Sequence, residues 1–147
     1  MQQHTPWIEK YRPKKFNEIV LDKFNRKILI NIINTGDFPN IILYGPPGTG
    51  KTTTIINLIR EYQEKHNEKN KNLVIHLNAS DDRGIDIIRN QIISFVRSKT
   101  LFVTGKKFIV LDEVDYMTKN AQCALRTLIQ QCPENVIFCL ICNYISR

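Results

Sequence analysis

Short apolar runs and longer amphipathic segments alternate along this chain. The runs are five to seven residues long and rich in Ile, Leu, Val and Phe, which is typical of strands buried in a sheet. They occupy residues 40–44, 73–77, 107–111 and 136–142. We therefore predict four buried strands.

The segments between the runs carry apolar residues at helical spacing. In the first segment Phe24, Ile28 and Ile32 recur every four positions, and Gly36 follows as a stop signal. The last helix has Thr118 as a suitable N-cap. The predicted helices cover 22–35, 52–66, about 85–96 and 118–131. This alternation predicts an α/β fold around an open sheet.

A glycine-rich loop joins the first strand to the second helix. It matches G-x-x-x-x-G-K-[ST], in which backbone amides and a helix N-terminus cradle phosphates. Lys51 would reach the β- and γ-phosphates, and the Thr52 hydroxyl would bind Mg²⁺. An ordinary glycine turn is the alternative. The loop consists of Gly45, Pro46, Pro47, Gly48, Thr49, Gly50, Lys51 and Thr52.

Polar residues end the third and fourth strands. Asp112 could hold the Mg²⁺ that Thr52 also binds, and Glu113 could orient and deprotonate a water. Asn143 would lie beside the γ-phosphate, because ligands of open α/β sheets bind at the carboxyl ends of strands. Asp115 could support the metal site or start a helix. A solvated acidic turn is the alternative for the pair.

Composition and charge agree with a globular domain. The 147 residues have 42% apolar content and a net charge of +7, of which the first 35 residues supply +4. A basic balance suits a polyanionic partner without proving one. We find no apolar run near the roughly 20 residues that span a bilayer and no signal peptide at the start, so we expect no membrane partner and an intracellular location.

Three further features have competing interpretations. Cys139 and Cys142 have the spacing of a zinc pair, but residues three apart on a strand point to opposite faces, which favours buried free thiols. His76, within an apolar strand, is expected to be a core histidine rather than a ligand. The segment 7–13 could line a purine pocket, although its composition alone favours a packed N-terminal arm.

Two long stretches make the sequence resemble a known family. Trp7 to Pro13 and Leu77 to Asp86, together with Cys142, Asn143 and Tyr144, are similar to the AAA+ ATPases and, within them, to the small subunits of replication factor C, the sliding-clamp loader. The resemblance covers 7–147. It implies a P-loop NTPase fold, a three-layer sandwich with a mainly parallel sheet, here truncated after the fourth core strand.

The resemblance also implies roles for individual residues. Glu113, Lys51 and Asn143 would be catalytic, and Thr52 and Asp112 would bind the metal. Residues expected to bind nucleotide are Tyr11, Arg12, Pro13, Ile19 and Val20 around the adenine, and Gly45, Pro46, Pro47, Gly48, Thr49, Gly50, Lys51, Thr52 and Thr53 around the phosphates. DNA-facing candidates are Arg83, Arg89 and Lys119, and Gln122 and Arg126 would couple DNA to Glu113.

The implied cofactors are ATP and Mg²⁺. The implied partners are the other subunits of a hetero-pentameric clamp loader, primer–template DNA and the sliding clamp, which the segment 95–102 would face. The implied location is the nucleus.

The sequence departs from the family in several places. Val114 stands where the family usually has Ala, and Thr127 replaces a common second arginine. We expect an adenine-side arm at 1–21 and an α/β core at 22–147, with the arginine finger, fifth strand, lid and collar absent. Residues 41–44 would then lie at an unpaired edge that favours self-association, and the chain alone would be poorly active.

Two other function classes remain possible. A P-loop phosphotransferase would use the same loop, but no acceptor-binding feature is evident. A nucleotide-bound scaffold without useful hydrolysis is disfavoured for a full subunit by Lys51, Asp112 and Glu113 but stays open for this chain. A GTP switch is disfavoured because 70–73 fails the guanine motif at its last position.

Overall fold

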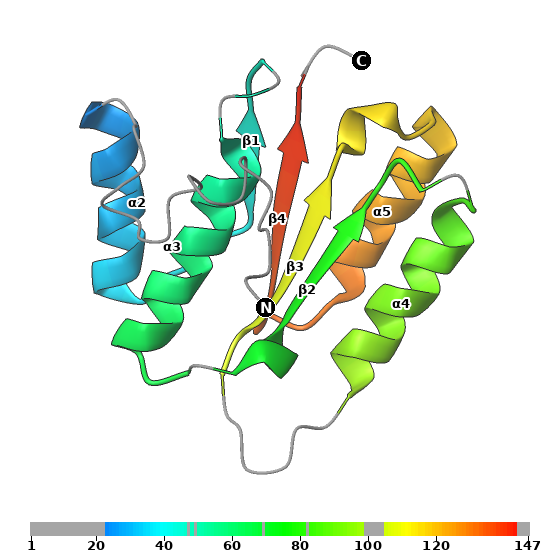
Figure 1. The fold of residues 1–147 in the computed structure, drawn as a ribbon. Coiled ribbons are helices and arrows are strands. Elements are labelled where there is room, and N and C mark those ends of the chain that lie inside the picture. Colours follow the sequence, from blue (N-terminus) through cyan, green and yellow to red (C-terminus); the bar gives the residue numbers. More distant parts are fainter. Residues whose placement is uncertain are drawn as a thin grey trace, which may run out of the picture.

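A computed structural model of the chain describes residues 23–46, 48, 50–68, 70–81, 83–98 and 105–143. For residues 23 and 24 it describes the backbone alone. Its elements carry the labels of Figure 1. The predicted elements are all present within two residues of their expected bounds. They are α2 (Lys23–Thr35), β1 (Ile41–Tyr44), α3 (Lys51–Lys65), β2 (Val74–Asn78), α4 (Ile85–Arg97), β3 (Lys107–Asp112), α5 (Lys119–Gln131) and β4 (Val136–Cys142), with short 3₁₀ turns η2 (Lys71–Leu73) and η3 (Val114–Tyr116).

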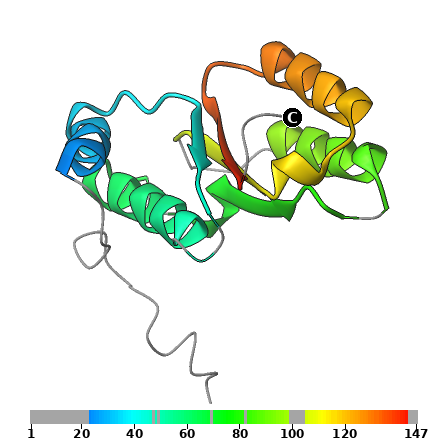
Figure 2. The ribbon, with the colours of Figure 1, turned by 90° about the horizontal axis from the view of Figure 1, so that it is seen from above.

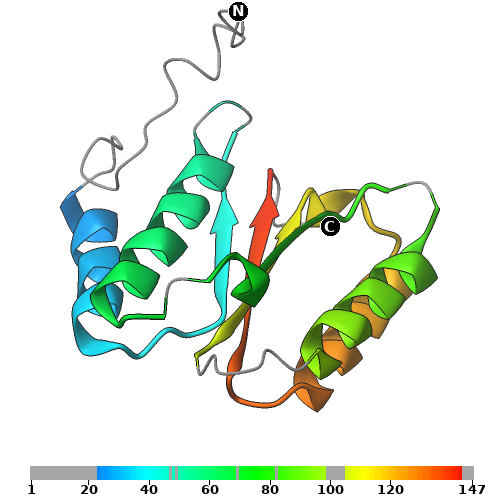
Figure 3. The same cartoon turned by 60° about the horizontal axis from the view of Figure 1, so that its bottom comes forward.

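The four strands form one parallel sheet in the order β1-β4-β3-β2. Helices α2 and α3 cover one face, and α4 and α5 cover the other (Figures 2 and 3). The predicted three-layer α/β sandwich is therefore confirmed. Because all strands run the same way, their carboxyl ends meet at one edge of the sheet.

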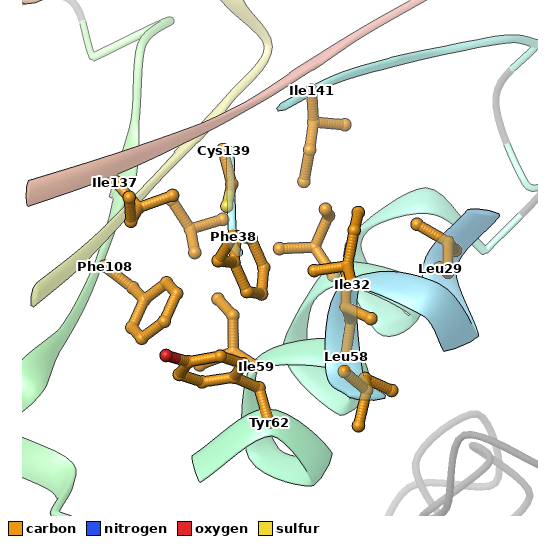
Figure 4. Close-up of a cluster of buried hydrophobic side chains, with 13 residues drawn as sticks. Leu29, Ile32, Phe38, Leu58, Ile59, Tyr62, Phe108, Ile137, Cys139 and Ile141 are labelled. Carbon is orange, nitrogen blue, oxygen red and sulfur yellow. The ribbon is translucent and has the colours of Figure 1, made fainter. Parts of the chain in front are cut away.

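Two hydrophobic cores lie on opposite faces of the sheet. Phe108, Val110 and Cys139 point into the core beneath α2 and α3, where Phe38 and Tyr62 pack edge-to-face against Phe108 with ring centroids 4.9 and 5.7 Å away (Figure 4). The alternate residues of β3 and β4 point into the core beneath α4 and α5. The two central strands are therefore buried on both faces.

The outer strands are less buried than the sequence indicates. Within the described residues, β1 and β2 are the two edges, and their alternate side chains are partly or fully exposed. Ile42 is 60% exposed and Tyr44 63%. Both strands were predicted to be buried, and this is wrong because each has one strand neighbour. The separate expectation that 41–44 lies at an apolar edge agrees with this arrangement.

The two minor predictions for this sheet have opposite outcomes. His76 is exposed on β2, so the expectation of a core histidine is wrong. Cys139 and Cys142 are free and buried and point to opposite faces of β4, as predicted. Burial raises the pKa of the Cys139 thiol to about 12.

The helix ends follow the local signals. Gly36 adopts φ 78°, the left-handed conformation that terminates α2. The Thr118 side chain accepts a hydrogen bond from the Ala121 amide and so caps α5. Among the described helices, none has the length and apolar character that crossing a membrane requires.

Candidate functional site

The carboxyl ends of the strands surround one polar pocket. Its volume is about 270 Å³, and its lining comes from the glycine loop, the start of α3 and the ends of β3 and β4. The lining residues are Gly48, Gly50, Lys51, Thr52, Thr53, Asp112, Glu113, Ile141 and Asn143. Sequence positions almost one hundred residues apart are thus brought together at the edge where open α/β sheets bind ligands.

The glycine loop needs glycine for its backbone conformation. Gly48 and Gly50 have φ values of 81° and 78°, and a Cβ at either position would meet nothing within 4 Å. Conformation rather than crowding therefore selects glycine here. The loop leads directly into α3, and the first three residues of this helix line the pocket. A helix N-terminus has unpaired amides and a positive dipole end, which suit an anion.

Lys51 is the first residue of α3 and turns back over the loop. Its Nζ donates to the carbonyl oxygens of Gly45 and Pro46, each at 2.8 Å. The ammonium group therefore lies against the start of the glycine loop, where its positive charge could attract a phosphate group.

Thr52 and Asp112 meet across the pocket. Thr52 Oγ1 donates to Asp112 Oδ2 at 2.8 Å, and the Glu113 amide donates to Asp112 Oδ1 at 3.0 Å. A hydroxyl and a carboxylate oxygen are hard donors of the kind that Mg²⁺ prefers, so the donor set fits this cation.

Glu113 is held away from a relaxed conformation. Its backbone is left-handed, with φ 58° and ψ 40°, which costs a residue other than glycine some strain. The Ser80 hydroxyl donates to Glu113 Oε2 and also lies 2.6 Å from Asn78 Oδ1. The sequence analysis missed Ser80, since a contact between residues 33 apart leaves no local signal.

Several predicted nucleotide-site residues lie outside the described residues. These are Tyr11, Arg12, Pro13, Ile19, Val20, Pro47 and Thr49. The whole segment 99–104, which overlaps the expected clamp-facing region 95–102, is also outside them. Their assignments stay predictions.

Comparison with known proteins gives the family. Residues 41–147 match the family described as ATPase family associated with various cellular activities, AAA. The chain belongs to this AAA family. Human replication factor C subunit 5 is 47% identical over 145 residues, which cover 98% of this chain and 42% of that protein. Replication factor C subunit 3 of Saccharomyces cerevisiae is 44% identical over 146 residues, covering 99% and 42%.

The AAA chain also shares its fold with solved structures. The RuvB Holliday junction branch migration motor of Thermotoga maritima aligns with a TM-score of 0.60 at 17% identity, over 90% of this chain and 42% of that one. PCH-2 of Caenorhabditis elegans aligns with a TM-score of 0.60 at 20% identity, over 87% and 40%. The chain spans about 42% of the length of the curated relatives that it matches.

Other candidate residues of the AAA chain lie away from the pocket. Arg83 pairs with Asp81 at 2.7 Å, and this guanidinium lowers the pKa of the Asp81 carboxyl to about 2. Arg89 lies 3.7 Å from Asp86 on α4. Lys119 is exposed in the first turn of α5.

Gln122 and Arg126 line a second groove. This groove has a volume of about 580 Å³ and runs between α5 and the exposed edge of β1, with Tyr44 and Cys142 also in its wall. Gln122 Nε2 donates to the Met117 carbonyl at 3.2 Å. Neither residue lines the pocket that contains Glu113, so a coupling role would need an intermediary such as η3.

Proposed function

We propose that this chain is the nucleotide-binding core of an ATPase subunit in a clamp loader of the replication factor C type. The observation that supports this most is the pocket shared by Lys51, Thr52, Asp112, Glu113 and Asn143. The 41–47% identity to replication factor C subunits points to the same class of assembly. Its substrate would be ATP with Mg²⁺.

Binding would rest on the glycine loop and α3. The backbone amides of 48–53 and the Lys51 ammonium would hold the phosphates, and Thr52 and Asp112 would hold Mg²⁺. A cation held by these two residues would supply positive charge that offsets the negative charge of the phosphates. Tyr11, Arg12, Pro13, Ile19 and Val20 would enclose the adenine.

Hydrolysis would depend on Glu113 and Asn143. Glu113 would accept a proton from a water whose oxygen attacks the γ-phosphorus, while the bond to the β–γ bridging oxygen breaks and ADP leaves. Asn143 would orient that water. The Ser80 hydroxyl holds Oε2 of Glu113, so either Oε1 would accept the proton or the side chain would first have to leave Ser80.

Partner contacts form the second half of the proposal. Arg83, Arg89 and Lys119 would contact DNA phosphates, which gives binding that ignores sequence and weakens with salt. Arg83 would exchange its carboxylate partner Asp81 for a phosphate. Gln122 and Arg126 would relay that event toward Glu113. The other subunits and the sliding clamp would complete the assembly, and the expected location is the nucleus.

A nucleotide-bound scaffold is the second candidate function. The contact between Ser80 and Glu113 favours it, because Ser80 holds one of the two carboxylate oxygens of Glu113 and so restricts how the side chain can turn toward a water. A phosphotransferase has less support, since the sequence shows no acceptor-binding feature.

The deciding experiment is the ATPase rate of the full subunit assembled with its partners, with and without primed DNA and clamp. We expect DNA and clamp together to raise the rate, Glu113→Gln to abolish it while ATP still binds, and Lys51→Ala to weaken ATP binding. Glu134→Gln, at an exposed position, is the matched control and should behave as wild type. A rate that ignores DNA, or a Glu113→Gln subunit as fast as wild type, would favour the scaffold.

A further inference from the structure

The described residues include two histidines with different environments. His66 Nε2 lies 2.8 Å from the Ile33 carbonyl oxygen, a contact that joins two helices. His76 Nε2 instead lies 3.6 Å from Asp112 Oδ2, next to the pocket but outside its lining. We propose that His76 is a positioning residue that holds the Asp112 carboxylate ready for a divalent cation, an inference that rests on the proposed function.

Strand register explains why these two side chains meet. In the parallel pairing of β2 with β3, His76 is opposite Val110 and Asn78 is opposite Asp112. Val110 points into the core beneath α2 and α3. Because side chains two apart share a face, His76 and Asp112 are diagonal neighbours on the face that α3 covers, and α3 supplies Thr52.

The Asp112 carboxylate has contacts to both of its oxygens. Oδ1 accepts from the Glu113 amide at 3.0 Å, and Oδ2 accepts from the Thr52 hydroxyl at 2.8 Å with His76 beside it. The terminal torsion of an Asp side chain is broad, so these contacts decide its orientation. When the Thr52 oxygen binds a cation, the imidazole remains as the neighbour that restrains Oδ2.

Groups behind a metal ligand commonly control metal affinity. Removing the hydrogen-bond partner of a ligating side chain lowers metal affinity about 10–100-fold. His76 occupies such a place, because it approaches Asp112 from the edge strand rather than from the pocket. A separation of 3.6 Å is slightly longer than a hydrogen bond, and a small rotation of either side chain would bring the two groups within that distance.

A structural role for His76 can be separated from this positioning role. The side chain is 44% exposed, so its removal should cost little folding free energy. A loss of metal affinity without a loss of stability would therefore come from the contact with Asp112.

The test is a Mg²⁺ titration of the purified subunit with a fluorescent ATP analogue, with a second titration of the analogue in EDTA. We expect His76→Ala to raise the Mg²⁺ concentration for half-maximal binding about tenfold. Metal-free binding of the analogue and the melting temperature should stay unchanged. His76→Gln keeps an N–H donor and should recover most of the loss.

Val74→Ala is the matched control, because it alters the same face of β2 two residues away from His76. It should leave the Mg²⁺ requirement unchanged. An unchanged requirement in His76→Ala, or equal losses with Mg²⁺ and in EDTA, would overturn the inference alone. A wild-type subunit that fails to bind the analogue would overturn the proposed function, and this inference with it.

Discussion

Cys139 lies in the middle of β4 with none of its surface exposed. Burial disfavours the thiolate, which is why the pKa of this thiol rises from 9.0 to about 12. Between these values the unfolded chain loses a proton that the folded chain keeps. The raised pKa thus makes a contribution to stability that is fully present below pH 9 and is lost as pH rises toward 12.

Replacing Cys139 by Val removes the titrating group at nearly constant volume. We expect the free energy of unfolding of wild type, relative to Cys139→Val, to fall by about 1.4 kcal/mol per pH unit above pH ~9. Urea unfolding between pH 8 and 10.5, roughly the range before general alkaline denaturation, measures this. Cys123→Val, on the exposed face of α5, should keep the wild-type slope. Parallel curves for all three proteins would contradict the prediction.

Single residues were the hardest part to predict from the sequence. The loop residues and the strand-end acids have strong local signals, and the structure brings them into one pocket. Ser80 and His76 have no such signal, because their contacts with Glu113 and Asp112 depend on the pairing of β2 with β3. Their chemical roles, like those of the whole site, stay predictions.

At the scale of elements, the C-terminal end of α4 depends on a buried lysine. Lys107 starts β3, is 8% exposed, and donates from Nζ to the carbonyls of Phe95, Val96 and Ser98 at 2.8, 3.0 and 2.6 Å. Phe95 and Val96 are in the last turn of α4, where carbonyls lack a partner within the helix, and Ser98 is its C-cap. The Phe95 carbonyl also accepts from the Ser98 hydroxyl at 2.6 Å. Burial lowers the pKa of Lys107, since it disfavours the charged form.

Lys107→Met should therefore destabilise the protein although Met is apolar. The variant keeps the side-chain length but removes the lysine donor from the carbonyls of Val96 and Ser98, while Phe95 keeps the Ser98 hydroxyl. We expect a loss of about 2 kcal/mol. Urea unfolding followed by circular dichroism measures it. Lys106→Met is the matched control, because Lys106 is only half-buried and donates to the Gly36 carbonyl. Its loss should stay under about 1 kcal/mol, and equal losses would argue against the capping role.

The elements themselves were predictable, and their burial was not. Helical periodicity and continuous apolar runs are local signals, so they identified every α-helix and strand in the described residues, although not the two 3₁₀ turns. Strand order is a property of the whole sheet. The run 73–77 is as apolar as 107–111, yet β2 lies at an edge and β3 in the centre.

At the scale of the whole molecule, the edge at β1 carries two of the most exposed large apolar side chains among the described residues. Ile42 and Tyr44 project from it beside the groove along α5. A parallel sheet with an open apolar edge is a template for pairing with another chain.

We expect this 147-residue chain to self-associate through that edge, and Ile42→Lys to suppress the association. Sedimentation velocity over a range of concentrations measures the oligomeric state. Ile30→Lys is the matched control, because Ile30 is 37% exposed on α2 and gives the same charge change away from the edge. A monomeric wild type, or equal suppression by both variants, would contradict the assignment of the edge.

The central position of β3 and β4 has a consequence for the order in which the molecule opens. Each of these strands has a strand neighbour on both sides, whereas the glycine loop follows the edge strand β1. Amides in 108–111 and 137–141 should therefore exchange with deuterium solely through global unfolding, while those of 45–50 exchange through local fluctuations. The acids of the pocket would then follow a strand that opens only when the whole protein unfolds. The glycine loop would follow an edge strand, so it can open and close locally while the centre of the sheet stays folded.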